Sequence, residues 1–126
     1  MAEFTKPHGK ILYLLIPSTD PEVSAEFYKG VFGWNIRTYT EGGLAFDDSV
    51  NQVHGRFTTQ LQAVDNPGFI LYIMVQDADE TEQRIAEYGG TVTDPADRDN
   101  FDIIGTFRDP GGNLFGFYEM KEGDEG

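Results

Sequence analysis

One pattern of landmarks occurs twice in this sequence, and that repeat limits the fold more than any other feature. Each copy has an apolar run, then an aspartate that can cap a helix, then a helix-like stretch that ends at glycine. The matching pairs, each separated by 57 residues, are Tyr13 and Ile70, Asp20 and Asp77, and Gly33 and Gly90. Two copies of one supersecondary unit are therefore expected.

The first copy predicts one helix among four strands. Residues 10–17 form an apolar run that stops at a proline, which is typical of a buried strand. Asp20 is a suitable N-cap, Pro21 suits the first helical turn, and the helix is predicted to end at Gly33. Short strands are predicted at residues 34–40, 44–47 and 52–61. The predicted order is βαβββ.

The second copy predicts the same order. Residues 69–76 form an apolar strand, and Asp77 begins a helix in which Glu80 can complete a capping box. Gly89 and Gly90 are predicted to end that helix. Strands are then predicted at residues 91–93, 103–108 and 114–119, the last two joined by a turn at residues 109–113. Three strands after each helix distinguish this order from the βαββαβ order of a ferredoxin-like sandwich.

Length and composition exclude several classes of protein. The 126 residues are enough for one compact domain and too few for two independent ones. Cysteine is absent, which excludes disulfides, thiolate catalysis and thiolate zinc sites. No stretch is typical of a membrane span or a secretory signal, so we expect a cytoplasmic protein that does not bind membranes.

The chain is strongly acidic, with 22 acidic residues against nine basic ones and a formal net charge of −13. Such a charge repels phosphate backbones, so nucleic acid is not expected as a partner. It would attract a cationic ligand. The acids are scattered along the chain, however, and this favours solubility or a saline environment as the explanation.

Several motifs carry a family resemblance that spans nearly the whole chain. They are Ile16-Pro17 with Asp20-Pro21, Ala25-Glu26-Phe27-Tyr28 with Val31-Phe32-Gly33-Trp34, Val75-Gln76-Asp77, Gly89-Gly90, and Asp109-Pro110-Gly111-Gly112-Asn113. With these motifs the sequence resembles the vicinal-oxygen-chelate superfamily, which includes glyoxalase I, bleomycin-resistance proteins, extradiol dioxygenases and methylmalonyl-CoA epimerase. The motifs indicate a fold, and none of them indicates a reaction.

The resemblance implies an α+β fold in which two tandem βαβββ modules form a curved mixed sheet with a concave cleft. We expect one domain over residues 1–126. Its modules are expected at about residues 8–63 and 68–120, followed by an acidic tail at 121–126.

The resemblance also bears on metal binding, because metal-dependent members carry His, Gln or Glu ligands on the first and last strand of each module. It places these positions at Tyr13, Ile70, Gly116 and near Thr59. Ile70 and Gly116 have no donor atom, and a phenol stays protonated at neutral pH, so we predict no metal and no cofactor. The register near Thr59 leaves His54, Gln60 and Gln62 open as a fourth donor.

Residues two apart on a strand share a face, and this alternation predicts the lining of the cleft. The predicted ligand-binding residues are Tyr13, Leu15, His54, Arg56, Ile70, Tyr72, Met74, Gly116 and Tyr118. Gly116 is expected to leave room at the floor of the cleft. The alternative is that the tyrosines fill a core or a dimer interface, and that His54 is an ordinary strand-edge histidine.

Three functions are compatible with these features. The first is a metal-independent protein that binds an apolar or aromatic small molecule. The second is a glyoxalase-, lyase-, epimerase- or dioxygenase-like enzyme with a non-standard or metal-free site, in which a tyrosine, His54 or an acid moves the proton. The third is an interaction domain with a vestigial cleft. We favour the first because the missing ligands count against metal chemistry, and we assign no catalytic residues.

We also expect a homodimer. The resemblance implies this, because paired modules in relatives of this length often complete a cleft, or cover an edge strand, across a subunit interface.

Overall fold

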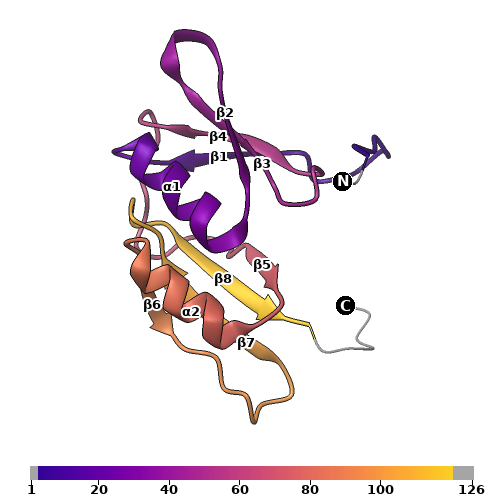
Figure 1. Cartoon of the computed structure of the whole chain (residues 1–126), viewed down its shortest axis with the longest axis vertical. Helices are drawn as coiled ribbons and strands as arrows, with labels where there is room; N and C mark the ends of the chain where they lie inside the picture. Colours follow the sequence, from indigo (N-terminus) through magenta and orange to yellow (C-terminus); the bar gives the residue numbers. More distant parts are fainter. Residues whose placement is uncertain (1–2, 121–126) are drawn as a thin grey trace.

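The computed structural model describes residues 3–120 and has two modules, each with one helix and one four-stranded sheet (Figure 1). The first contains β1 (Tyr13–Pro17), α1 (Pro21–Phe32), β2 (Asn35–Thr38), a 3₁₀ turn η1 (Thr40–Gly42), β3 (Leu44–Asp47) and β4 (His54–Thr58). The second contains β5 (Tyr72–Val75), α2 (Ala78–Glu87), β6 (Thr91–Asp94), β7 (Ile103–Arg108) and β8 (Leu114–Glu119). The predicted α+β class and the doubled βαβββ order are confirmed. The expected acidic tail lies outside the described residues.

The two sheets have the same topology. Their strand orders are β1-β4-β3-β2 and β5-β8-β7-β6. The first and last strands of each module pair in parallel, and the other pairs are antiparallel. The first strand of each module is therefore an edge strand, because only one of its sides is hydrogen-bonded within the chain.

The predicted helix caps are present. The Asp20 carboxylate accepts from the Val23 amide at 3.5 Å, and the Asp77 carboxylate accepts from the Glu80 amide at 3.1 Å. Gly33 ends α1 at φ 72°, in the left-handed region that glycine tolerates without strain. Neither helix has the length or the apolar composition needed to cross a membrane.

The core is aromatic and is shared between the modules. The Tyr28 ring on α1 stacks on Trp34 with ring centroids 4.6 Å apart, inside the first module. The ring of the neighbouring Phe27 packs against the ring of Phe107 on β7, with ring centroids 5.8 Å apart. The same helix therefore packs against the second sheet. Because α1 buries rings from both modules, the chain forms one core.

A buried carboxylate joins the modules at the turn between β7 and β8. Asp109 accepts from the Tyr28 hydroxyl at 2.8 Å and from the Asn113 amide at 2.9 Å. The Asn113 side chain donates to Asp109 at 2.9 Å and to the Pro17 carbonyl, at the end of β1, at 2.7 Å. Burial raises the pKa of Asp109, and hydrogen bonds from Asn113 and Tyr28 oppose that rise. We call Tyr28, Asp109, Asn113 and the Pro17 carbonyl the Asp109 latch.

Replacing Asp109 with alanine is expected to lower the free energy of unfolding by about 2–4 kcal/mol, because it leaves buried donors of Tyr28 and Asn113 unpaired. Chemical denaturation measures this change. The exposed Asp99→Ala is the matched control and should change the free energy of unfolding by less than about 0.5 kcal/mol. A loss below about 1 kcal/mol for Asp109→Ala would show that the latch is not a main source of stability.

Candidate functional site

The first sheet buries one face against α1 and leaves the other open. Along β1, Leu14 and Ile16 join the core, whereas Tyr13 and Leu15 point outward. The strand register then gives two outward rows across β1, β4, β3 and β2. The rows are Tyr13, His54, Asp47 and Asn35, and Leu15, Arg56, Ala45 and Arg37. We call this surface the first open face.

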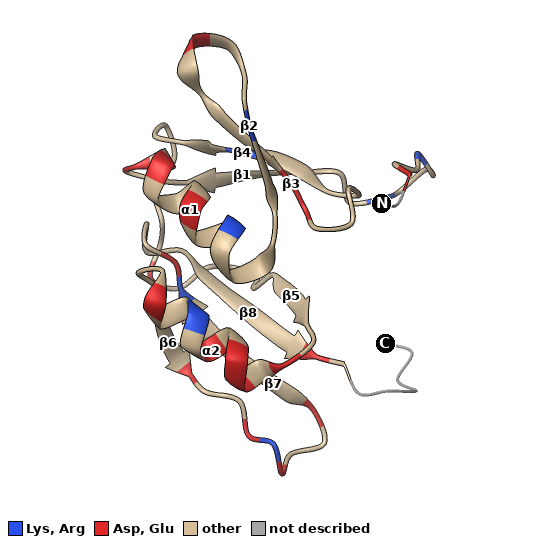
Figure 2. Cartoon of the chain, in the orientation of Figure 1, with Lys and Arg blue, Asp and Glu red and all other residues tan. Residues whose placement is uncertain are grey.

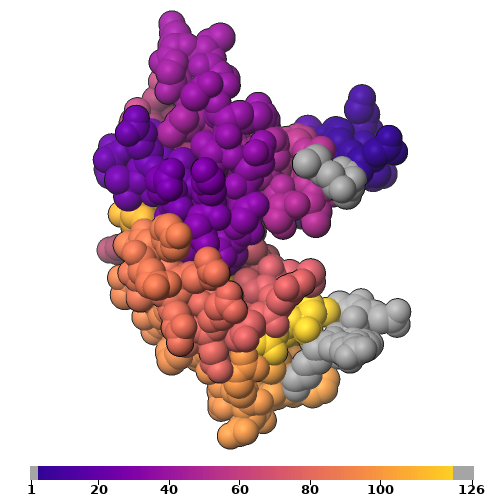
Figure 3. Space-filling model, in the orientation of Figure 1, coloured from indigo at the N-terminus to yellow at the C-terminus, as the bar shows by residue number. Residues whose placement is uncertain are grey.

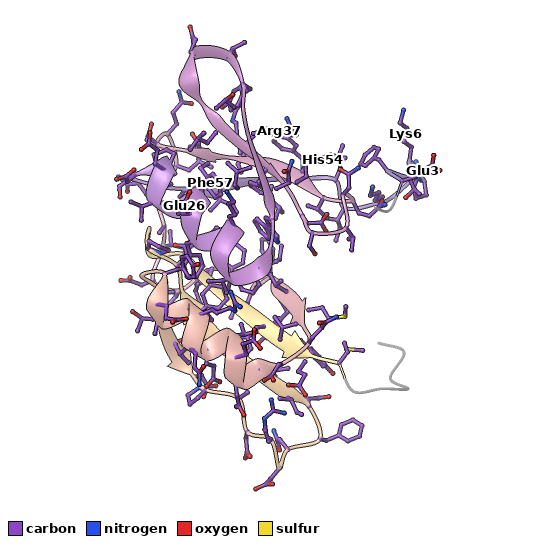
Figure 4. The ribbon with its side chains drawn as sticks, viewed as in Figure 1. Glu3, Lys6, Glu26, Arg37, His54 and Phe57 are labelled. Carbon is purple, nitrogen blue, oxygen red and sulfur yellow. The ribbon has the colours of Figure 1, made fainter. Side chains whose placement is uncertain are left out.

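Asp47 is the centre of a polar cluster on this face. Its carboxylate accepts two hydrogen bonds from Arg37, at 2.8 and 3.0 Å, and one from the Asn35 amide at 3.2 Å. His54 Nδ1 lies 2.6 Å from Asp47 Oδ1. The Arg37 hydrogen bonds are the main cause that lowers the pKa of Asp47 to about 2, so this carboxyl is ionised at neutral pH. Figure 4 shows Arg37 and His54 side by side at the end of the sheet that faces the N-terminal segment.

The ionised carboxylate determines how His54 can act. A carboxylate only accepts hydrogen bonds, so in the neutral imidazole the short contact assigns the ring proton to Nδ1 and leaves Nε2 as an acceptor. An imidazole oriented in this way by a carboxylate is the arrangement of a general base. The cluster can therefore bind a ligand donor or accept a proton.

The N-terminal segment covers part of this cluster. The Phe4 ring lies 4.7 Å from the His54 ring, and Lys10 Nζ lies 3.8 Å from the centre of the Phe4 ring on its own segment. Gln52 Oε1 holds the segment by accepting from the Thr5 amide at 3.3 Å and from Lys10 at 2.8 Å. Phe4 therefore limits the approach of a ligand to one side of His54.

The outward side of the second sheet, with Tyr72, Met74, Gly116 and Tyr118, carries most of the remaining predicted residues of the cleft, and we call it the second open face. Tyr72 lies beside Gly116 in the ladder, and Met74 lies beside Tyr118, whose hydroxyl donates to Asp102 at 2.8 Å. A Cβ at Gly116 would overlap the Tyr72 ring. The expectation that Gly116 leaves an open floor is therefore wrong, because that ring occupies the space.

The strand register shows which residues stand beside Tyr13 and Gly116. Tyr13 pairs with His54, one of the residues left open for the fourth ligand position, and Gly116 pairs with Tyr72. Ile70 precedes β5. The first strands are thus offset by 59 residues and the helix caps by 57, because β5 is one residue shorter than β1 and the connection from β5 to Asp77 is one residue shorter than that from β1 to Asp20.

The residues at the four ligand positions do not fit the metal site of the metal-dependent relatives. The parallel register brings Tyr13 beside His54 in the first module and Tyr72 beside Gly116 in the second. Gly116 offers no donor and phenols are poor ligands for divalent ions, so His54 Nε2 is the one ordinary metal donor among these four residues. Among residues 3–120, no three His, Asp or Glu side chains converge on a point that could hold a metal ion.

Two hollows adjoin the open faces. A mainly apolar cavity of about 220 Å³ lies between β1, β8 and the linker between the modules, where Leu15 and Leu114 line it. A groove of about 400 Å³ runs between the end of α1, the β3–β4 loop and β5, and Met74 is on its wall. This groove lies at the notch between the two modules in Figure 3.

The structure thus places the nine predicted residues in two groups, one on or beside each sheet. Sequence reasoning missed Arg37, Asn35, Asp47 and Phe4. Strand alternation was a usable signal for Arg37 and Asp47. Both fall in predicted strands, at positions whose side chains point to the outward face of the sheet. The position of Phe4 had no sequence signal, because it depends on how the N-terminal segment folds back.

Comparison with known proteins identifies the family. A model of the glyoxalase-like domain matches residues 13–118 of the chain. A glyoxylase-like domain-containing protein from Didymella fabae is 28% identical over 96 residues, which are 66% of this chain and 70% of that protein.

Solved structures share the fold at low identity. A glyoxalase/bleomycin resistance protein/dioxygenase family enzyme from Burkholderia phytofirmans PsJN has a TM-score of 0.70 at 16% identity, covering 90% of this chain and all of that one. An antibiotic-binding protein from Streptomyces sp. CB03234 has a TM-score of 0.67 at 20% identity, covering 93% of this chain and 100% of that one. At these identities the likeness concerns the fold alone.

Asp47 is expected to make the protein acid-sensitive. Its pKa is lower in the folded chain than the ordinary value of about 3.9. The ionised carboxylate therefore contributes fully to the free energy of unfolding above about pH 4, and this contribution is lost as pH falls towards 2. Replacing Asp47 with asparagine should remove on the order of 1–2 kcal/mol of unfolding free energy at pH 7 and little at pH 2. Denaturation of both proteins from pH 2 to 7 measures this.

The difference between wild type and Asp47→Asn isolates this group from Asp109. The raised pKa of Asp109 acts in the opposite direction, because the free energy of unfolding falls as pH rises and this buried carboxyl ionises. Asp99→Asn is the exposed control. Parallel pH profiles for wild type and Asp47→Asn would contradict the prediction.

Proposed function

The chain belongs to the glyoxalase-like domain family, and we propose that it is a small-molecule binding protein that holds an apolar or aromatic ligand without a metal. The open faces of its sheets form the binding surface. The observation that carries this proposal is the exposure of large apolar side chains there, with Tyr13 50% exposed, Tyr72 42% and Met74 70%. A group of such side chains left in water is typical of a surface that another molecule covers.

The chemistry of these side chains suits organic ligands. Aromatic rings and a thioether offer flat or adaptable apolar contact, and the tyrosine hydroxyls and His54 add a few polar groups that can orient a ligand. A structural relative described as an antibiotic-binding protein supports a binding role for this fold.

Metal independence is supported by the donor set. The Tyr72 ring covers Gly116 at the last-strand position of the second module. On the first open face, Asp47 is the one carboxylate of the two outward rows, and it is already paired with Arg37. Hard and borderline metal ions need several such donors at once.

We further propose that two copies of the chain pair to complete the binding surface. Large apolar side chains are exposed on β1 and β5, which are one edge strand of each sheet, and on the residues that lead into them. They are Ile11, Leu12, Tyr13, Leu15, Phe69, Ile70, Tyr72 and Met74. A second copy would cover these edges and bury apolar area.

The Asp47–His54 pair favours a second candidate function, a metal-free enzyme of the same family. In this case His54 Nε2 would take a proton from the bound molecule and Asp47 would hold the ring in place. Conversion of a bound compound, detected by NMR and lost in His54→Gln while binding persists, would favour the enzyme over the binding protein.

Purified protein is expected to contain no stoichiometric zinc, nickel, iron or manganese, and to bind a neutral aromatic probe such as 2-naphthamide equally well with and without EDTA. Tyr13→Ala should weaken that binding about five- to tenfold, because it removes a lining ring. Elemental analysis and calorimetric titration measure the two results. Tyr88→Ala is the matched control, since Tyr88 is 40% exposed but belongs to the end of α2.

Two results would contradict this proposal. One is a tightly bound metal in each chain whose removal abolishes probe binding. The other is equal weakening by Tyr13→Ala and Tyr88→Ala, which would indicate non-specific adhesion to exposed rings.

Light scattering at micromolar concentration should give twice the 14.1 kDa mass of the chain. Met74→Asp should shift the protein to the monomer, because it places a charge in the apolar surface of β5. Val23→Asp is the control, since Val23 is an exposed apolar residue on α1. The dimer should also tighten at higher salt, which screens the repulsion between two chains of charge −13. A monomer under all these conditions would remove the dimer proposal.

A further inference from the structure

The five arginines of the chain differ in how their N–H groups are used. Four donate to carboxylates or to backbone carbonyls, namely Arg37, Arg84, Arg98 and Arg108. Arg56 differs from them. Within residues 3–120 its guanidinium has no hydrogen-bond or ion-pair partner. The Tyr39 ring lies 6.0 Å from the guanidinium carbon.

Arg56 lies on the first open face, not on a solvated helix. It is partly buried in β4, between Leu15 of β1 and Ala45 of β3. Ala45 is small and almost fully buried, so the longer side chains around it form the surface. The exposed Leu15 is the strand partner of Arg56, and Tyr13 lies in the next outward row, so an apolar patch of the same face adjoins the Arg56 side chain.

The cross-strand row through Arg56 contains no acid. The other residues of that row are Leu15, Ala45 and Arg37, and the next pair along β1 and β4 is Pro17 and Thr58. Asp47 stands in the neighbouring outward row, and Arg37, Asn35 and His54 already donate to it. The positive charge of Arg56 is therefore uncompensated where a ligand would lie.

We propose that Arg56 binds the carboxylate of an apolar or aromatic acid whose carbon body lies over Leu15 and Tyr13. This proposal rests on the proposed function and adds the charge of the ligand to it. A guanidinium binds a carboxylate through two parallel hydrogen bonds, and such a pair is stronger and more directional than one between neutral groups. One uncompensated arginine matches one carboxylate and does not match a polyanion.

The overall acidity of the chain does not oppose this site at close range. Figure 2 shows the acidic residues mostly on α1, α2 and the loops, whereas basic positions mark β2 and β4 of the first sheet. Charges more than a Debye length apart, about 8 Å at physiological salt, are largely screened. The guanidinium in contact with the ligand therefore outweighs the distant acids. The net charge slows the approach of an anion without removing its local partner.

Three probes with the same ring system and different charge test the proposal. They are 2-naphthoate, 2-naphthamide and 2-(aminomethyl)naphthalene, which are anionic, neutral and cationic at pH 7.5. Calorimetric titration of the full chain should show that the naphthoate binds about tenfold more tightly than the amide, and the amine more weakly than either.

Arg56→Met keeps the apolar stem of the side chain and removes its charge. It should weaken naphthoate binding about tenfold, to the level of the amide, and leave amide binding within about twofold. Arg56→Lys keeps the charge and loses the two-pronged geometry, so it should fall between wild type and Arg56→Met. Arg84→Met on α2 is the matched control and should bind all three probes as wild type does.

Each of the other possible results would contradict either the carboxylate site or the proposed binding function. Equal binding of naphthoate and amide, tightest binding of the amine, or an unchanged naphthoate affinity in Arg56→Met would overturn the carboxylate site and leave the proposed binding function standing. Absence of binding for all three probes at millimolar concentration would overturn both. Because the Arg56 guanidinium has no hydrogen-bond partner among the described residues, its variants should keep the wild-type melting temperature, and a large drop would contradict its description as uncompensated.

Discussion

The buried carboxylate of Asp109 is the contact on which the arrangement of the two modules depends. It lies in a turn of the second module and binds the hydroxyl of Tyr28 on the helix of the first. Asn113 connects the same carboxylate to the end of β1. Burying a carboxyl costs free energy, which these donors offset only while helix, strand and turn keep their relative positions. The latch therefore fixes how β1 and β8 lie relative to each other, and with them both open faces.

The chemistry of the first open face follows from how its charges are distributed. Arg37 pairs with Asp47 and keeps it ionised, and ionised Asp47 in turn orients His54. Because Asp47 is fully engaged, it leaves Arg56 without a carboxylate partner on the same face. One interaction thus produces both an oriented imidazole and an uncompensated guanidinium. Both lie beside exposed apolar side chains on β1, which is the combination that the proposed binding of an organic acid needs.

Much of this fold could be predicted because its signals are local. An aspartate cap, a proline in the first turn and a terminal glycine act within a few residues, and α1 begins and ends where they indicate. Strand alternation likewise predicted that Tyr13, Leu15, Tyr72 and Met74 point away from the helices. The pairing of His54 with Tyr13 was not predictable in the same way, since register depends on loop lengths and on contacts between strands far apart in the sequence.

By itself the sequence determined the doubled βαβββ order, the caps of both helices and the outward parity of the strands, because these depend on each residue and its near neighbours. Only the tertiary structure decided which outward side chains meet. It placed the Tyr72 ring over Gly116, brought Asp47 to His54 and Arg37, and left Arg56 uncompensated. Each of these depends on strand register and on side-chain packing between distant segments. Local propensity carries no information about such contacts, because their energy exists only once the sheet has formed.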